Sequence, residues 1–342
     1  MRGCLCCRGI IPGVLFIILF MAANGVPGTS EAAQPLAYRL KWLINASTAG
    51  DVVALKQGFF DRQELAVDVK AGGPERDAIR ELELGYAQFG VASADQVIRA
   101  LAKEASVVVL AQLFQVNPLQ WIYRADAFTL SRVQDLAGRT VGITYGGNDE
   151  TIMRALLALA GMDETRVRLA SVRYDYTPFY RNQVQVWPVY RNTQGIFLAD
   201  KLKAGGERVA FFDPSDHGVQ FVANSVVTSQ EMIDRQPQVV KRFMQALLDG
   251  WRAAIRPDNE DAAVGAVAEY DRDTDESVIR RQLSVTRRMI QPDPSIPVGH
   301  IDTAAWQQTE AIMLRQGLIG KPVNVVGRLI VDPWPVTPPS DG

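Results

Sequence analysis

The chain has 342 residues, of which 47% are hydrophobic and 22% charged, with 36 Lys and Arg against 38 Asp and Glu. This length allows two domains of about 150 residues each, and the composition excludes disorder for most of the chain. The net charge of -2 offers no basic stripe for nucleic acid and no basic block for an anionic membrane surface, so neither is expected as a partner.

The first 32 residues have the pattern of a secretory signal peptide. Arg2 and Arg8 flank a short basic start, an apolar run covers 14–23, and small residues precede a cleavage site after Ala32. A retained membrane anchor is the alternative, but the run is shorter than the roughly 20 residues that span a bilayer. All three cysteines lie before residue 8. We therefore expect a periplasmic mature protein without a disulfide or a cysteine-based metal site.

After this segment, β-rich runs alternate with helical patterns. Strands are expected at 37–44, 65–69, 87–92 and 107–114, and helices at 50–58, 74–84 and 94–103. This alternation predicts βαβ units and a mostly parallel sheet with helices on both faces.

A second α/β series begins after Pro118. Its strands are expected at 139–144, 167–172, 184–187 and 209–212, with helices at 150–160, 178–182 and 195–203. A strand at 219–226 follows, and then helices at 229–236, 239–256, 260–270, 275–289 and 303–316. The expected domains are a discontinuous first lobe, 33–117 plus 218–331, a second lobe, 118–217, and a mobile proline-rich tail, 332–342.

Small and polar loops follow several of the expected strands. They cover 45–48, 93–95, 115–117 and 146–149. In open α/β sheets, ligands bind at the carboxyl ends of strands. Two such lobes in an exported chain suggest a receptor for a small solute, with a hinge in the two chain crossings near 114–119 and 213–219.

Several stretches of the chain resemble one known family. They are Lys41–Phe60, Ala71–Pro74, Gln88–Ala100, Gln185–Tyr190 and Asp216–Phe221. Together they resemble the NMT1/THI5-like family, exported binding proteins of ABC importers for thiamine-pyrimidine precursors and related heteroaromatics. The resemblance implies a type II periplasmic-binding-protein fold, two α/β lobes around a ligand cleft. It also implies a small-molecule ligand, ABC permease subunits as partners and a monomeric protein.

The sequence also departs from the family pattern. Gln194 stands where the family commonly has a ligand-facing carboxylate, and the loop 146–149 lacks the usual Thr-Asp-Thr. The enzymatic fungal branch needs a cysteine cluster and a donor histidine in its first lobe, which the mature chain lacks. No G-x-S-x-G, P-loop or dinucleotide motif is present, and the two histidines are too far apart for a metal site. We expect no enzyme activity, no cofactor and no metal.

The candidate ligand-binding residues lie in the strand-end loops and their flanks. They are Trp42, Asn45, Asp95, Asn117, Gly147, Asn148, Trp187, Tyr190, Gln194 and His217. Core packing is the alternative for Trp42, and helix capping is the alternative for Asn45 and Asp95. Trp187 precedes a proline at a strand end, where its ring can stack on a planar ligand.

The charges of the expected cleft loops suggest a ligand class. Asp51, Asp95, Asp149, Glu150, Asp213 and Asp216 stand against a single nearby base, Arg191. This balance favours a neutral or amine-bearing planar heterocycle over a nitrate or sulfonate-type anion. A receptor for such an anion and the ligand-binding subunit of a sensory system remain the alternatives.

Overall fold

The computed structural model describes residues 35–73, 76–173 and 175–331, and all of them belong to one compact unit, Gln34–Gly342. The expected signal peptide and the expected tail lie outside the described residues. Within the described ranges, no helix is both long enough and apolar enough to cross a membrane.

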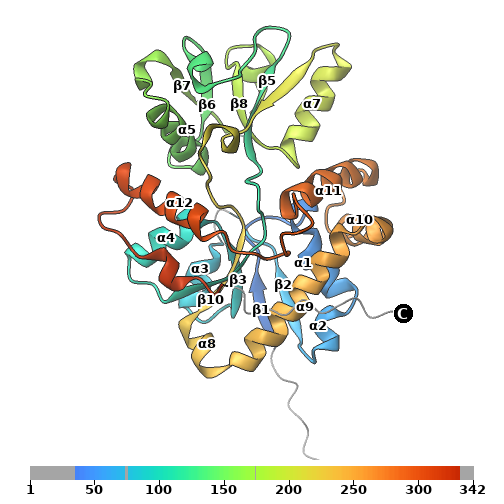
Figure 1. The fold of residues 1–342 in the computed structure, drawn as a ribbon. Coiled ribbons are helices and arrows are strands. Elements are labelled where there is room, and N and C mark those ends of the chain that lie inside the picture. Colours follow the sequence, from blue (N-terminus) through green and yellow to red (C-terminus); the bar gives the residue numbers. More distant parts are fainter. Residues whose placement is uncertain (1–34, 74–75, 174, 332–342) are drawn as a thin grey trace, which may run out of the picture. The chain divides into compact units, whose positions relative to one another are not determined.

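The first sheet has the strand order β2-β1-β3-β10-β4 (Figure 1). Its strands are β1 (Leu36–Arg39), β2 (Val67–Lys70), β3 (Phe89–Ala92), β4 (Val107–Gln112) and β10 (Ser225–Ser229). β1 pairs in parallel with β2 and β3, whereas β10 pairs antiparallel with β3 and β4.

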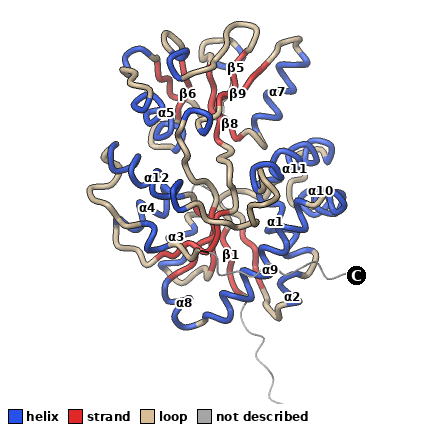
Figure 2. Tube along the Cα trace, in the orientation of Figure 1, coloured by secondary structure: helices blue, strands red, loops and turns tan. Residues whose placement is uncertain are grey.

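Helices cover both faces of this sheet (Figure 2). They are α1 (Ala49–Lys56), α2 (Phe59–Arg62), α3 (Ala78–Glu83), α4 (Ala94–Ala102), α8 (Gln230–Arg235), α9 (Pro237–Ile255), α10 (Glu260–Ala268), α11 (Glu276–Ile290) and α12 (Thr303–Arg315). The 3-10 helices η1 (Ala46–Thr48), η5 (Pro257–Asn259) and η6 (Val325–Arg328) complete this part. Alternation along β1 sends Tyr38 into a core with Phe243 of α9 and Ala37 into a core with Trp306 of α12.

The second sheet has the order β7-β6-β8-β5-β9. Its strands are β5 (Leu119–Arg124), β6 (Thr140–Ile143), β7 (Arg168–Ser171), β8 (Val186–Tyr190) and β9 (Val209–Phe212). Its helices are α5 (Asn148–Leu159), α6 (Thr177–Tyr180), α7 (Gln194–Ala204), and the 3-10 helices η2 (Val133–Leu136), η3 (Glu164–Arg166) and η4 (Ser215–His217).

The expectation of mostly parallel sheets is confirmed, because four of the five strands of each sheet run in one direction and one strand runs against its two neighbours. β5 pairs antiparallel with β8 and β9, as β10 does with β3 and β4. These two strands are the first that form after the chain passes from one sheet to the other. Each starts beside the carboxyl end of a neighbour, Leu119 opposite Tyr190 of β8 and Ser225 opposite Ala92 of β3, and its direction is therefore reversed.

Two strand predictions need correction. β5 was not expected, because five of its six residues are buried and it lacks the alternation of a half-exposed strand. The strand expected at 219–226 starts only at Ser225. The residues before it do not pair with a neighbouring strand. Instead, Phe221 O accepts from Asn117 Nδ2, and Val222 O accepts from Ala94 N.

Candidate ligand-binding site

After each of four parallel strands, a side-chain oxygen of the loop or of the following helix accepts a hydrogen bond from a nearby backbone N–H. The four pairs are Asn45 Oδ1 with Ser47 N at 2.8 Å, Gln96 Oε1 with Ser93 N at 3.1 Å, Glu150 Oε2 with Gly146 N at 2.7 Å and Gln194 Oε1 with Tyr190 N at 3.3 Å. These bonds satisfy backbone donors in the turns that lead from a strand into the following helix. These local bonds therefore account for the carbonyl oxygens of Asn45 and Gln194.

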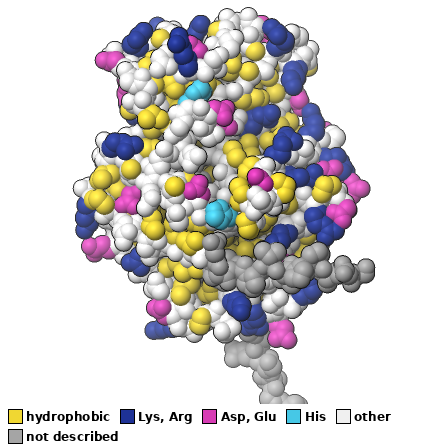
Figure 3. Space-filling model, viewed as in Figure 1, with side chains coloured by type: hydrophobic (Ala, Val, Ile, Leu, Met, Phe, Trp, Pro, Cys, Tyr) yellow, Lys and Arg dark blue, Asp and Glu magenta, His cyan; other side chains and the backbone are white. Residues whose placement is uncertain are grey.

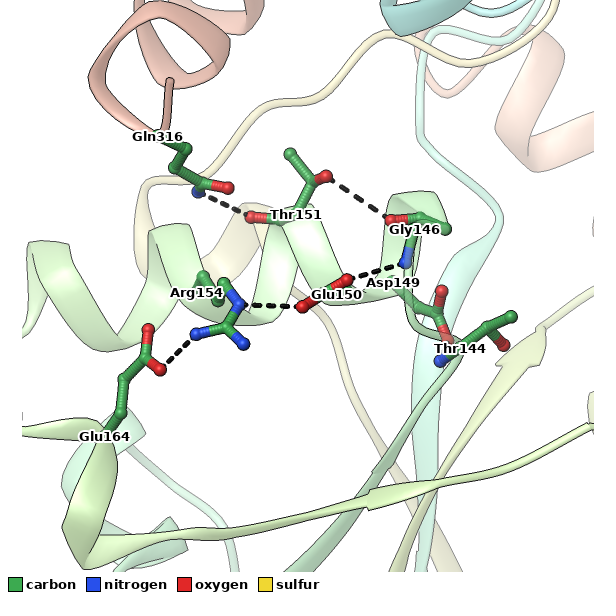
Figure 4. A network of polar contacts seen from close by, with 9 residues as sticks. Thr144, Gly146, Asp149, Glu150, Thr151, Arg154, Glu164 and Gln316 are labelled. Carbon is green, nitrogen blue, oxygen red and sulfur yellow. Dashed lines mark hydrogen bonds and ion pairs between the residues drawn. The ribbon is translucent and has the colours of Figure 1, made fainter. Parts of the chain in front are cut away.

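The start of α5 carries its own negative charge (Figure 4). Asp149 Oδ2 accepts from Thr144 N at 2.6 Å, and burial raises the pKa of this carboxyl. Glu150 also accepts from Arg154 Nε at 3.0 Å, and Arg154 in turn pairs with Glu164. This arrangement disfavours a second anion at the helix start.

Gly147 and Asn148 belong to this turn. Gly147 is the residue before α5, and a Cβ there would lie 2.5 Å from Asp149 Oδ1, so the close approach of the carboxylate requires glycine. Asn148 is the first residue of the helix. Both keep their predicted place at a strand-end loop.

The acids that were expected around the cleft are mostly engaged within the protein. Asp51 is 1% exposed and accepts from the Tyr38 hydroxyl at 2.6 Å, which corrects its assignment to the cleft. Asp95 is buried, accepts from Ser93 Oγ at 2.5 Å and lies 3.8 Å from Arg99. Its carboxylate supports the start of α4.

Asp213 and Arg191 complete the charge pattern. Asp213 accepts from Ser215 N at 2.9 Å and from Gln120, and burial raises the pKa of its carboxyl. The Arg191 guanidinium lies 4.0 Å over the Phe211 ring, and its pKa is lowered by burial and by the charge of Arg288 on α11. Figure 3 shows Lys and Arg side chains gathered over α10 and α11, with acids among them. An excess of free acids is therefore not a sound argument for the ligand class.

Half-exposed aromatic rings occur at three strand ends. Trp42 follows β1 and is 38% exposed, Tyr190 ends β8 and is 37% exposed, and Tyr145 follows β6 and is 56% exposed. Tyr145 was missed by the sequence analysis, although it directly precedes the Gly-Gly turn that was selected. These rings can contact a planar ligand.

Trp187 does not have such an exposed face. Its ring is 1% exposed and packs against Tyr176 and Phe179, with ring centroids 5.8 Å and 5.9 Å away. The expected stacking of Trp187 on a ligand does not fit this placement, because its side chain points into the core of the second sheet. The proline that follows does not change this direction, since successive side chains of a strand alternate between faces.

Asn117 and His217 lie on the two chain crossings. Asn117 Nδ2 donates to Phe221 O at 2.6 Å, and its Oδ1 accepts from Leu119 N at 2.9 Å. Both ends of the amide thus bind backbone, and Asn117 ties one crossing to the other. His217 stacks on Phe212 with ring centroids 4.3 Å apart and an interplanar angle of 15°.

A cavity of about 180 Å³ lies beside the crossings. We call it the crossover pocket; it is lined by Gln112, Phe114, Gln115, Val116, Asn117, Ile152, Asp213, Pro214, Ser215, Val219, Gln220, Phe221, Val222, Asp302 and Ala305. It holds one of the predicted site residues, Asn117. Its volume suits a single small ring rather than a large ligand.

The loops of the two sheets meet at Asn192, which the sequence analysis missed. Asn192 follows β8, is 0% exposed, and donates through Nδ2 to Ser47 Oγ and to Thr286 Oγ1, each at 2.9 Å. This contact brings the loop of Tyr190 and Gln194 to the loop of Asn45. Asp95 instead contacts Ser93 and Arg99, and His217 stacks on Phe212. The only available signal for Asn192 was its place next to the family-like stretch that ends at Tyr190.

Two further contacts join the elements around the two sheets. Arg281 of α11 forms an ion pair with Asp200 of α7 at 2.7 Å, and Gln316 Nε2, just after α12, donates to Thr151 O of α5 at 2.9 Å (Figure 4). Within the described ranges, no group of three His, Cys, Asp or Glu side chains is placed to hold a metal ion.

Comparison with known proteins identifies the family and the fold. Residues 45–260 match the family model described as NMT1/THI5 like. The formylaminopyrimidine-binding protein of Halalkalibacterium halodurans is 24% identical, over 87% of this chain and 91% of that protein. The riboflavin-binding protein RibY of Chloroflexus aurantiacus is also 24% identical, over 93% of this chain and 95% of that protein.

The solved structures that resemble this chain include periplasmic binding proteins. The aliphatic sulphonate-binding protein SsuA of Escherichia coli matches with a TM-score of 0.68 and 17% identity, over 90% of this chain and 96% of that one. SsuA of Xanthomonas axonopodis pv. citri, bound to MOPS, matches with a TM-score of 0.62 and 16% identity, over 87% and 99%. The chain therefore has the type II periplasmic-binding-protein fold, two α/β lobes around a cleft. The match over 45–260 shows that it belongs to the NMT1/THI5-like family.

Proposed function

We propose that this protein is the exported solute receptor of an ABC importer and that it binds a small planar heteroaromatic compound. One observation carries the ligand class: Trp42, Tyr145 and Tyr190 each present a half-exposed ring at the carboxyl end of a parallel strand. Rings at this edge favour a flat ligand, because stacking uses the whole face of both partners. The names of the two relatives, for formylaminopyrimidine and riboflavin, agree with this class.

The receptor acts by closure of two lobes on the ligand. In this proposal, residues 33–117 and 218–331 form one lobe, residues 118–217 form the other, and the crossings that Asn117 ties together form the hinge. Contacts from both lobes to one ligand are satisfied together only in the closed state, so binding shifts the population toward that state. The closed, monomeric receptor then docks on permease subunits in the membrane and carries out no chemical reaction.

Export and ligand class are tested with two preparations. The chain expressed with its first 32 residues should be recovered from the periplasm with a mature N-terminus near residue 33. Purified mature protein should then be screened by thermal shift against aminopyrimidines, flavins, alkanesulfonates and nitrate, each at equal ionic strength. Stabilisation by heterocycles supports the proposal, whereas stabilisation by the anions alone overturns it in favour of an anion receptor.

A further inference from the structure

Asn192 is held in one orientation by its neighbours. Thr286 Oγ1 donates its hydrogen to Gln282 O at 2.9 Å, so it can only accept from Asn192. The amide nitrogen of Asn192 must therefore face Thr286, with Ser47 Oγ at 2.9 Å on its other hydrogen. This fixes the carbonyl oxygen of the side chain on the opposite side of the amide.

That carbonyl oxygen has no hydrogen-bond partner among the described residues, although Asn192 is 0% exposed. Gln282 Oε1, one turn before Thr286 on α11, is a second buried acceptor without a partner in this part of the chain. Buried acceptors in native proteins almost always have a donor. Two of them within one α11 turn of the Asn192 contact are acceptors that the described chain does not satisfy, so their donor is either a ligand group or an ordered water.

The position of Asn192 indicates which molecule supplies this donor. Asn192 lies on the loop between β8 and α7, two residues after the exposed ring of Tyr190, and it contacts η1 near Asn45 and Trp42. The contact joins elements of the two lobes in the proposed function. In the closure proposed above, a ligand group would reach Asn192 Oδ1 before the contact with Ser47 forms and would be enclosed by that contact.

We propose that Asn192 Oδ1 is the specificity-determining acceptor for an N–H donor, such as a ring amino group, of the ligand. The assignment rests on the proposed function and deepens it from a planar heteroaromatic to an amine-bearing one. A ligand without the amino group leaves a buried, oriented acceptor unpaired, which is the strongest form of discrimination a polar site offers. Asn192 thus selects its ligand through a buried acceptor that the described chain leaves without a donor.

The test compares matched ring pairs that differ only in the amino group. Affinities of 4-aminopyrimidine against pyrimidine, and of adenine against purine, are measured by calorimetry on the mature wild type and on Asn192→Leu and Thr286→Val. The wild type should bind the amino member at least about tenfold more tightly. Thr286→Val removes the acceptor that orients the amide, so the preference should fall to less than about threefold in both variants.

Thr309→Val is the matched control. Thr309 is also a buried helical threonine that donates to the carbonyl four residues earlier, Ala305 O at 2.9 Å, but it lies on α12 and accepts from Val222 N, not from Asn192. It should keep the wild-type preference, which separates a general effect of losing a buried hydroxyl from loss of the oriented amide.

Each remaining outcome decides the matter. The role of Asn192 is overturned if the wild type binds both members of a ring pair equally, or if the amino preference persists in Asn192→Leu and Thr286→Val. The donor to Asn192 Oδ1 is then only an ordered water. Binding of no heterocycle at all overturns the proposed function as well. A crystal structure with bound 4-aminopyrimidine should place its amino nitrogen within hydrogen-bond distance of Asn192 Oδ1.

Discussion

The Tyr38 hydroxyl donates to Asp51 Oδ1 over 2.6 Å, deep in the core between the first sheet and its helices. Trp251 Nε1 lies 3.4 Å from the same oxygen. Burial raises the pKa of Asp51 to about 7, although the two hydrogen bonds lower it in part. The folded protein therefore keeps a proton on Asp51 at pH values where the unfolded chain, with a pKa near 3.8, has lost it.

This difference predicts that stability falls as the pH rises from about 4 to about 7. In that window the folded state binds more protons than the unfolded state, so the free energy of unfolding decreases with pH. One group shifted from 3.8 to about 7 contributes at most about 4 kcal/mol to this change. Urea denaturation at pH 5 and pH 8 should show a smaller difference for Asp51→Asn than for the wild type.

The exposed Asp61 of α2 provides the control for this pH prediction. Asp61→Asn changes the charge equally but should retain the wild-type difference between the two pH values. An unchanged difference in Asp51→Asn would show that Asp51 does not titrate in this range.

Two glycines set the distance between α1 and α9. A Cβ on Gly50 would lie 2.0 Å from Trp251 Cδ2, and a Cβ on Gly250 would lie 2.4 Å from Ala54 Cβ. Gly50→Ala should therefore destabilise the fold by about 1–3 kcal/mol or more through overpacking. Gly265→Ala on α10 meets nothing within 4 Å and should instead stabilise by about 0.5–1 kcal/mol, the ordinary helical preference for alanine. Chemical denaturation curves measure both, and equal effects would contradict the close packing.

The sequence predicted the helices of the second half closely, because their ends carry local signals. α9 starts at Pro237, which suits a first helical turn, and α12 starts after Asp302, whose side chain accepts from Ala305 N. The reversed strands β5 and β10 could not be predicted in the same way. Their direction depends on how the chain passes between two sheets, and no local pattern records it.

The sequence predicted which loops lie at the candidate site, but not the direction of each side chain. The strand-end loops were found, yet Asp51 and Trp187 point into cores, since α1 is buried on almost every side and β8 packs on α6. Asn192 was missed because its partners Ser47 and Thr286 are 145 and 94 residues away in the sequence. A contact between residues so far apart in the sequence produces no motif with a characteristic spacing.

Asn117 should control the coupling of the two chain crossings. Its amide binds Phe221 O at 2.6 Å and Leu119 N at 2.9 Å, so Asn117→Ala leaves two backbone groups unpaired and should cost about 1–3 kcal/mol of stability. Asn117→Asp keeps the acceptor for Leu119 but turns a carboxylate oxygen toward Phe221 O in place of the donor, so it should cost at least as much as the alanine variant. Thermal denaturation ranks the variants, and identical midpoints for the alanine variant and the wild type would refute this role.

Closure of the lobes is tested by small-angle scattering. The radius of gyration of the mature protein should decrease when a tight heterocyclic ligand from the screen is added, because both lobes contact the ligand only when they are closed. In Asn117→Ala the decrease should be smaller, since the crossings are no longer tied. A radius of gyration that stays constant at saturating ligand would argue against hinge closure.

Two tryptophans separate ligand contact from core packing. Trp42 is 38% exposed after β1, and Trp187 is 1% exposed within the second sheet. Trp42→Ala should weaken heterocycle binding by about 1–3 kcal/mol, the scale of one lost aromatic contact, and change the melting temperature little. Trp187→Ala should instead lower the free energy of unfolding by about 3–5 kcal/mol, because it leaves a cavity in a core. Calorimetric affinities and denaturation curves of both variants distinguish the two roles, and a stable Trp187→Ala protein with lost affinity would restore Trp187 to the ligand site.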